Sequence, residues 1–182
     1  MIPPWNLSGI LPPFVGTSPA GAGSPYWTTT EELAKRFAGT PARRIIFQGF
    51  LRYRRALVGV GIRDAFQWVN GSFIEDVERM QNRNPGDIDL VTFGHVPVDP
   101  KDTAAKIAFR DAHLDLFDSK QAKQQYSCDA YYVDLSLDAR KVIDRACYWS
   151  NLFSHRRATQ LWKGMVALDL AGDDSVAWTL IT

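Results

Sequence analysis

The sequence predicts an α+β domain, in which helices flank a mixed central sheet and an irregular arm precedes both. Short apolar and aromatic runs of strand length alternate with longer segments whose apolar residues recur at helical spacing. Most of the prolines and several glycines, by contrast, fall within residues 1–27, where they disfavour both regular structures. The 182 residues are enough for one domain with a substantial core.

The composition is that of an ordinary globular protein. Hydrophobic residues make up 46% and charged residues 23%, and a formal net charge of +1 gives no overall field that attracts nucleic acid or an anionic membrane. No apolar run approaches the roughly 18 residues of a membrane span, and the N-terminus lacks the pattern of a secretory signal. Cys128 and Cys147 form neither a disulfide framework nor a metal-ligand spacing, so we expect a cytoplasmic protein with no membrane partner.

Residues 1–27 are expected to form a proline- and glycine-rich arm that packs on the domain. Its large apolar side chains are too many for a free linker; they are Trp5, Leu7, Ile10, Leu11, Phe14, Tyr26 and Trp27. We expect the arm to be loosest from Gly16 to Gly23. A structural strap is the favoured interpretation, and an arm that binds a partner is the alternative.

Two helices are expected after the arm. The first begins at Thr28–Thr30, where threonine caps and acidic residues suit a helix start, and ends at Gly39. The second begins at Pro41 and extends to about Gly59. Its apolar face comprises Ile45, Ile46, Gly49, Phe50, Tyr53, Leu57 and Val60. The basic residues around it are Arg43, Arg44, Arg52, Arg54, Arg55 and Arg63. We favour a solvated basic face over contact with RNA or a triphosphate.

The stretch from residue 66 to 93 carries the residues that point to chemistry. Phe66–Asn70 is typical of a strand, and after a polar loop Asp87–Phe93 is typical of a second strand. Because side chains alternate along a strand, Asp87 and Asp89 share one face, roughly 7 Å apart. Two like charges there cost stability unless a divalent cation such as Mg²⁺ (or Mn²⁺) is held by them.

Gly71-Ser72, directly after the first of these strands, supports two interpretations. Glycine lets another group approach the backbone closely, and free N–H groups with a serine hydroxyl can hold a phosphate. In the second interpretation, Ser72 and Glu75 form a helix capping box that needs no ligand. A phosphate cradle facing a metal platform is the combination that nucleotidyl transfer needs.

These motifs resemble the signature of the polymerase-beta-like nucleotidyltransferase superfamily, in which Gly-Ser is followed by Asp-x-Asp. The whole chain is similar to a small uncharacterised family of bacterial and phage proteins with that signature, from the prolines of residues 2–13 to the strand of residues 162–166. Fourteen residues separate Ser72 from Asp87, more than is usual in the superfamily, and we expect an insertion around residues 78–84.

The resemblance implies a minimal nucleotidyltransferase fold over residues 28–182, as a single domain. It implies that Gly71 and Ser72 bind a nucleoside triphosphate such as ATP, and that Asp87 and Asp89 hold the metal. Similar folds occur in toxin–antitoxin and phage-defence systems, which is an analogy and no more.

A third carboxylate is expected from the strand at residues 126–137. Asp129 opens this strand, and Asp134 lies about 17 Å further along it. Asp87 and Asp89 also open their strand, so a ligand beside them comes from a strand start, which favours Asp129 over Asp134. In the family that the chain resembles, the matching aspartate is followed by a similar aromatic run.

The remaining elements are expected from periodicity and turn residues. They are a helix at 102–123, a helix at 138–149, a loop at 151–157, a strand at 163–170, and a tail at 171–182 that turns at Gly172 and adds an edge strand. His155, Arg156 and Arg157 could guide an acceptor or the nucleotide phosphates, although an exposed polar loop is the favoured interpretation.

The expected function is Mg²⁺-dependent nucleotidyl transfer from a nucleoside triphosphate to a hydroxyl acceptor. Asp129 would complete a second metal site and help to deprotonate that hydroxyl. The acceptor stays open between an RNA end, a protein, a small molecule and another nucleotide. The alternative is a catalytically inactive nucleotide- or partner-binding module of the same fold, and a metal-using glycosyltransferase is a more distant one.

Overall fold

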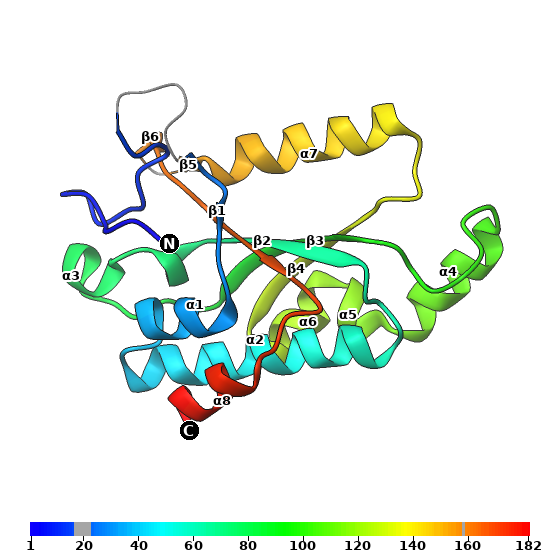
Figure 1. Cartoon of the computed structure of the whole chain (residues 1–182), viewed down its shortest axis with the longest axis horizontal. Helices are drawn as coiled ribbons and strands as arrows, with labels where there is room; N and C mark the ends of the chain where they lie inside the picture. Colours follow the sequence, from blue (N-terminus) through cyan, green and yellow to red (C-terminus); the bar gives the residue numbers. More distant parts are fainter. Residues whose placement is uncertain (17–22, 158) are drawn as a thin grey trace.

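The computed structural model has an α+β architecture built on a mixed five-stranded sheet (Figure 1). The strand order is β1-β7-β2-β3-β4, and β5 and β6 form a separate two-stranded sheet. The fold class expected from the sequence is therefore confirmed. The structure describes residues 1–16, 23–157 and 159–182, so most of the segment from Gly16 to Gly23, expected to be the loosest part of the arm, lies outside the described residues.

The sheet combines parallel and antiparallel pairs. Strand β1 is parallel to β7, β7 and β3 are both antiparallel to β2, and β3 is parallel to β4. The strands are β1 Tyr26–Trp27, β2 Ala65–Asn70, β3 Ile88–Gly94, β4 Cys128–Asp134, β5 His155–Arg156, β6 Leu161–Trp162 and β7 Val166–Asp169.

Helices cover the two faces of the sheet unequally. Figure 1 shows α7 along one side, whereas α1, α2, α5, α6 and α8 lie on the other. The helices are α1 Thr30–Phe37, α2 Pro41–Gly59, α3 Val77–Gln81, α4 Thr103–Ala112, α5 Leu114–Phe117, α6 Ser119–Tyr126, α7 Ala139–Phe153 and α8 Ser175–Ile181, with a short 3₁₀ helix, η1, at Ser72–Ile74.

The core is divided in the same unequal way. The larger cluster of buried side chains packs around α2, whose Phe50, Tyr53 and Leu57 are completely buried. The smaller cluster lies on the α7 face and contains Val91, Phe93, Val133, Trp149, Phe153 and Met165. Helices therefore cover less of the α7 face of the sheet than of the other face, and part of the α7 face is left open for a binding site.

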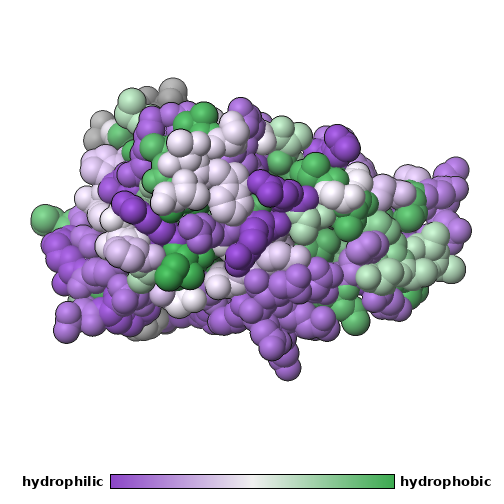
Figure 2. Space-filling model, turned by 90° about the horizontal axis from the view of Figure 1, so that it is seen from below, coloured by the Kyte–Doolittle hydropathy of each residue, from purple (hydrophilic) through white to green (hydrophobic). Residues whose placement is uncertain are grey.

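The outer surface on the α2 and α8 side is mostly hydrophilic. Figure 2 shows this face from below, with hydrophobic residues in separate groups among hydrophilic ones. Among the described residues, no helix combines the length and the apolar character needed to cross a membrane.

Two arginines that were expected on a solvated face of α2 are buried, so that prediction was wrong for them. Arg54 donates to Asp174 at 2.9 Å and to Gln67 at 2.8 Å. Arg43 donates to the Glu78 carboxylate at 2.6 Å and to main-chain carbonyls. Both guanidinium groups thereby gain the partners that a buried charge requires. The neighbouring Arg44, Arg52, Arg55 and Arg63 are exposed.

The single helix expected at 102–123 is three helices. Helix α4 ends at His113, and the carboxylate of Asp118 accepts the N–H groups of Lys120 and Gln121, which starts α6. An aspartate that accepts backbone N–H groups favours a new helix start over the interior of a longer helix. The apolar periodicity of the segment concealed this break.

The C-terminal tail and the loop at 151–157 also differ from expectation. The tail forms α8 and not an edge strand, and Ala177 and Ile181 of this helix are buried in the larger core cluster. Helix α7 continues to Phe153, and residues 155–156 then form β5. Burial of one apolar side of the tail against α1 and α2 decides for a helix.

Two tyrosines with buried hydroxyl groups make a matched test of core hydrogen bonding. The hydroxyl of Tyr53 donates to the carbonyl of Leu116 at 3.0 Å, whereas the buried hydroxyl of Tyr132 has no partner within the described part of the chain. Tyr53→Phe should therefore lower the free energy of unfolding by about 1–2 kcal/mol, and Tyr132→Phe should leave it unchanged or raise it. Urea denaturation measures both, and equal losses would contradict the assignment of these bonds.

Candidate functional site

Acidic residues gather where the parallel strands β3 and β4 begin. The register pairs Asp89 with Asp129 directly, and Asn70 at the end of β2 pairs with Asp89 from the other side. Neighbouring strands lie about 4.8 Å apart and paired residues point to one face, so the two carboxylates leave the sheet side by side. Asp87 precedes Asp89 by two residues and shares that face. This is the α7 face of the sheet, because Val91 and Phe93 continue the alternation into the smaller core cluster.

The charges of these carboxylates influence one another. Burial, followed by the nearby charges of Asp87 and Asp129, raises the pKa of Asp89 to about 6. Lys163 and Arg157 act in the opposite direction without cancelling the rise. The protein therefore concentrates negative charge here at a cost to its own stability.

Asp87 has a cationic partner that the sequence did not suggest. Its carboxylate lies 2.5 Å from Nζ of Lys123, a half-exposed side chain at the end of α6. With Asp87 in this ion pair, the described residues contain no group of three His, Cys, Asp or Glu side chains that could hold a metal ion as they stand. Asp89 and Asp129 are the carboxylates that the sheet itself brings together.

Gly71 is required by the position of Asp89. Its φ of 80° lies in the region that favours glycine, and a Cβ there would be 1.7 Å from Oδ2 of Asp89. Its N–H donates to Oδ1 of Asn70 at 2.7 Å, and Nδ2 of Asn70 donates to the carbonyl of Phe153 at 2.6 Å. The expected close approach to Gly71 is therefore an approach by Asp89, and the Gly71 N–H, expected to be free for a phosphate, is already bonded. Ser72 follows as the first residue of η1.

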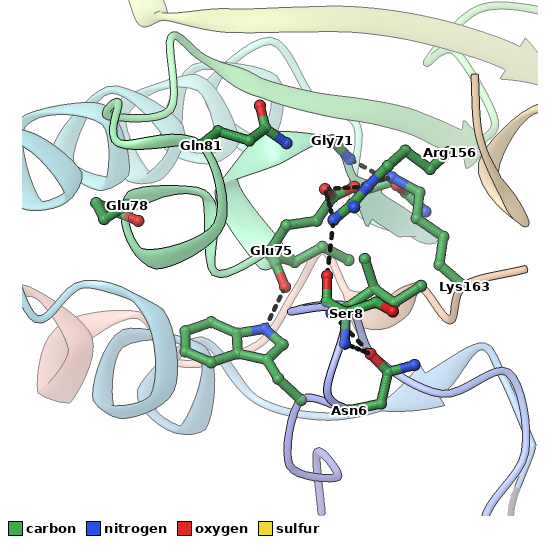
Figure 3. A network of polar contacts seen from close by, with 12 residues as sticks. Asn6, Ser8, Gly71, Glu75, Glu78, Gln81, Arg156 and Lys163 are labelled. Atoms are coloured by element: carbon green, nitrogen blue, oxygen red, sulfur yellow. Dashed lines mark hydrogen bonds and ion pairs between the residues drawn. The ribbon is translucent and has the colours of Figure 1, made fainter. Parts of the chain in front are cut away.

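The capping box expected from Ser72 and Glu75 does not form, because Glu75 is the centre of a buried ion-pair network (Figure 3). Its carboxylate accepts from Nζ of Lys163 at 2.6 Å and from Nη2 of Arg156 at 2.8 Å. Arg156 also donates to the carbonyl of Ser8, which connects the N-terminal arm to the network. Burial lowers the pKa of Lys163, although Glu75 opposes this change.

The basic cluster expected in a loop is thus divided between two environments. Arg156 is engaged with Glu75, whereas Arg157 is exposed and close enough to Asp89 to influence its pKa. The ring of His155 packs against Trp162. Sequence reasoning missed Lys163, although a lone lysine directly before an apolar strand was a usable signal.

Asp134, the alternative third carboxylate, lies at the other end of β4. It pairs in register with Gly94 and forms an ion pair with Lys106 at 3.1 Å. Its carboxylate also accepts hydrogen bonds from Ser136. Five residues of extended strand separate it from Asp129, about 17 Å. The structure brings Asp129 and not Asp134 beside Asp89.

The Glu75 network predicts a large effect from a small change. Glu75→Gln leaves the buried Lys163 and the partly buried Arg156 without their counter-charge and should lower the free energy of unfolding by about 3 kcal/mol. Glu31→Gln, which breaks the exposed pair with Lys35, is the control and should cost less than about 1 kcal/mol. The double variant Glu75→Leu/Lys163→Met replaces the buried ion pair by apolar side chains, and it should recover much of the stability lost in Glu75→Gln. Urea denaturation measures each variant, and a loss for Glu75→Gln no larger than the control would contradict this network.

Comparison with known proteins gives a family and no function. No match was found among curated proteins, and none among solved structures. A model of a family of unknown function, DUF6932, matches residues 3–169. This match covers most of the chain, including every acidic residue of the site, and the chain therefore belongs to the family of unknown function DUF6932.

Proposed function

We propose that the protein transfers a nucleotidyl group from a nucleoside triphosphate to a hydroxyl acceptor, with Mg²⁺ (or Mn²⁺) as cofactor. The observation that carries the proposal is the pairing of Asp89 with Asp129 against the Gly71-Ser72 turn. The order of elements also agrees with the resemblance to polymerase-beta-like nucleotidyltransferases: a strand, Gly-Ser, a strand with Asp-x-Asp, helices, and a parallel strand that opens with an aspartate.

The donor set suits a divalent metal. Asp87, Asp89 and Asp129 offer the carboxylate oxygens that Mg²⁺ prefers, and they would hold it once Asp87 exchanges Lys123 for the metal. The raised pKa of Asp89 supports this fit, because a bound cation would favour the ionised carboxylate that burial and the charges of Asp87 and Asp129 disfavour. When bound, the metal would neutralise triphosphate charge and favour the ionised form of an attacking hydroxyl.

The protein's own groups have distinct parts in this proposal. Arg157, exposed beside Asp89, and the hydroxyl of Ser72 would bind the outer phosphates. Asp129 would accept the proton of the acceptor hydroxyl, whose oxygen forms a bond to the α-phosphorus as the α–β bridging bond breaks and pyrophosphate leaves. Lys163, paired with Glu75, would lie near Asp89 and partly offset its negative charge. Neither Lys163 nor Glu75 would contact a substrate.

Removal of two of the three carboxylates should abolish metal-dependent nucleotide binding. Asp87→Asn/Asp89→Asn removes two of three anionic ligands, so ATP affinity in the presence of Mg²⁺ should fall at least tenfold, toward the affinity of the wild-type protein in EDTA. Isothermal titration calorimetry measures this change. Asp64→Asn, an exposed carboxylate at the opposite end of β2 from Asn70, is the control and should bind as the wild type does. Equal binding by the double variant and the wild type would exclude the metal platform.

Transfer itself is tested with nucleoside triphosphates labelled at the α-phosphate. Incubation with cell extract and Mg²⁺ should label an RNA, protein or small-molecule fraction with the wild type and not with Asp129→Asn. Labelled product reports both activity and acceptor class. Binding of ATP without labelled product under any metal would favour the alternative, a nucleotide-binding module.

The pKa of Asp89 gives a pH-dependent signature. Its folded-state pKa of about 6 lies above the unfolded value near 3.9, so the charged form costs stability above pH 6, and this cost disappears as the pH falls through 6 toward 4. In metal-free buffer, Asp89→Asn should raise the free energy of unfolding by up to about 2 kcal/mol at pH 8, and by much less at pH 4.5.

Asp134→Asn supplies the control of opposite sign. Burial would raise the pKa of Asp134, but hydrogen bonds from Ser136 and the charge of Lys106 outweigh it and lower the pKa. Its ionised form is therefore stabilising at pH 8, and Asp134→Asn should lower stability by nearly the same amount at pH 8 and pH 4.5, because this stabilisation is lost only as the pH falls below about 4. Urea denaturation at both pH values compares the variants. A gain for Asp89→Asn that is independent of pH would show that ionisation of the Asp89 carboxylate is not its cause.

A further inference from the structure

A cavity of about 470 Å³ opens between α4 and α7, over the second half of β4. We call it the α4–α7 groove. The residues used below are Lys106, Arg110, Tyr131, Arg145, Tyr148 and Trp149, all of which line it. Its volume is in the range of sites for small organic ligands, roughly 300–1,000 Å³. The proposed transfer chemistry does not use this cavity.

The groove continues the sheet face that carries the carboxylates. Asp129, Tyr131 and Val133 alternate along β4 and therefore point to one side, with Tyr131 roughly 7 Å along the strand from Asp129. Tyr131 and Val133 both line the groove. A molecule in the groove would thus lie next to Asp129, the residue proposed to accept a proton from the acceptor.

Aromatic rings line the groove and are available for stacking. Trp149 is buried, and it packs against Tyr131 with ring centroids 4.7 Å apart and against Tyr148 at 5.3 Å. Tyr131 is 39% exposed and Tyr148 is 56% exposed. An anchored tryptophan with two exposed tyrosines offers ring faces on which a planar group can stack.

The charge of the groove is positive. Lys106 is neutralised by Asp134 at 3.1 Å. Arg110 and Arg145 are exposed, and neither forms an ion pair with any residue that the structure describes. Two guanidinium groups beside aromatic rings suit a ligand that is both planar and anionic.

The helices that form the groove are weakly held by the core. Helix α4 has no buried residue, and α7 buries only Trp149 and Phe153, both near its C-terminal end. Figure 1 shows α4 and the N-terminal part of α7 extending toward the same end of the molecule. The exposed Ile107 and Leu137 leave apolar surface between them. The core therefore fills little of the space between these two helices.

We propose that the α4–α7 groove is the acceptor subsite and that it binds a nucleotide, with the base on Tyr131 and Tyr148 and the phosphate on Arg110 and Arg145. Its role as acceptor subsite rests on the proposed nucleotidyl transfer. The ligand is either a free nucleotide or the end of a single-stranded RNA, which share this chemistry.

Binding is measured without triphosphate and in EDTA, so that the metal site is silent. AMP is titrated by calorimetry, and a labelled single-stranded hexa-adenylate by fluorescence anisotropy. Tyr148→Ala and Arg145→Glu should each weaken binding about tenfold or more, because one stacked base or one charge-assisted contact contributes that much, and Tyr148→Phe should bind as the wild type does. Binding of AMP indicates a free nucleotide, and binding of the oligonucleotide alone indicates an RNA end.

Two controls separate this proposal from others. Arg52→Glu reverses an exposed charge on α2, across the sheet, and should bind as the wild type does. Asp89→Asn should lose transfer and keep groove binding. The proposal is overturned if the wild type binds neither ligand, if Arg145→Glu binds as well as the wild type, or if Arg52→Glu alone weakens binding.

The two proposals can also fail separately. Groove binding without transfer by the wild type leaves a nucleotide site and removes the transferase function. Transfer that is undiminished in Tyr148→Ala and Arg145→Glu keeps the transferase function and removes the groove as its acceptor subsite. Circular dichroism confirms that each variant is folded, which is expected because Tyr148 and Arg145 are exposed.

Discussion

A parallel register between β3 and β4 sets Asp89 beside Asp129, and the rest of the site follows from it. Parallel strands require a crossover, which here comprises α4, α5 and α6. The end of that crossover is fixed against α2, where a Cβ on Gly49 would be 2.0 Å from the carbonyl oxygen of Tyr126. Because Tyr126 is two residues before Cys128, this contact determines where β4 begins. The close contact between Gly49 of α2 and Tyr126, on the opposite side of the sheet, thus helps to place Asp129 beside Asp89.

The cationic residues around the carboxylates lie at two depths, some in the interior and some near the surface. Glu75 binds Lys163 and Arg156 in the interior, and Lys123 and Arg157 lie nearer to solvent. The inner cations are fixed by buried partners, whereas the outer ones can exchange partners at little cost because solvent screens them. The buried ion pairs therefore stabilise the folded protein around these acidic residues in the absence of a ligand. The exposed cations can leave the acidic residues when a ligand binds.

Much of the fold followed from local sequence signals. The limits of α2 agree with the predicted start at Pro41 and end near Gly59, and the strands before and after the Gly71-Ser72 turn lie where apolar runs predicted them. The break at Asp118 and the helical tail were missed, because apolar periodicity does not separate one helix from several, or a short amphipathic helix from an edge strand. Arg43 and Arg54 were misjudged because their acidic partners, Glu78 and Asp174, are distant in sequence. The proximity of Asp89 to Asp129 was predictable from strand starts, whereas the ion pairs of Asp87 and Glu75 depend on tertiary packing.

The contact between Gly71 and Asp89 has a consequence for how the family can diverge. Any side chain at position 71 displaces the carboxylate of Asp89, and a residue other than glycine also strains the backbone there. If the acid at position 89 is replaced by a smaller residue, the steric restriction on position 71 is relaxed, and only the backbone strain remains. A lineage that replaces the acid at position 89 would therefore be freer to replace the glycine at position 71, and joint replacement of the two residues would mark family members in which this site has changed.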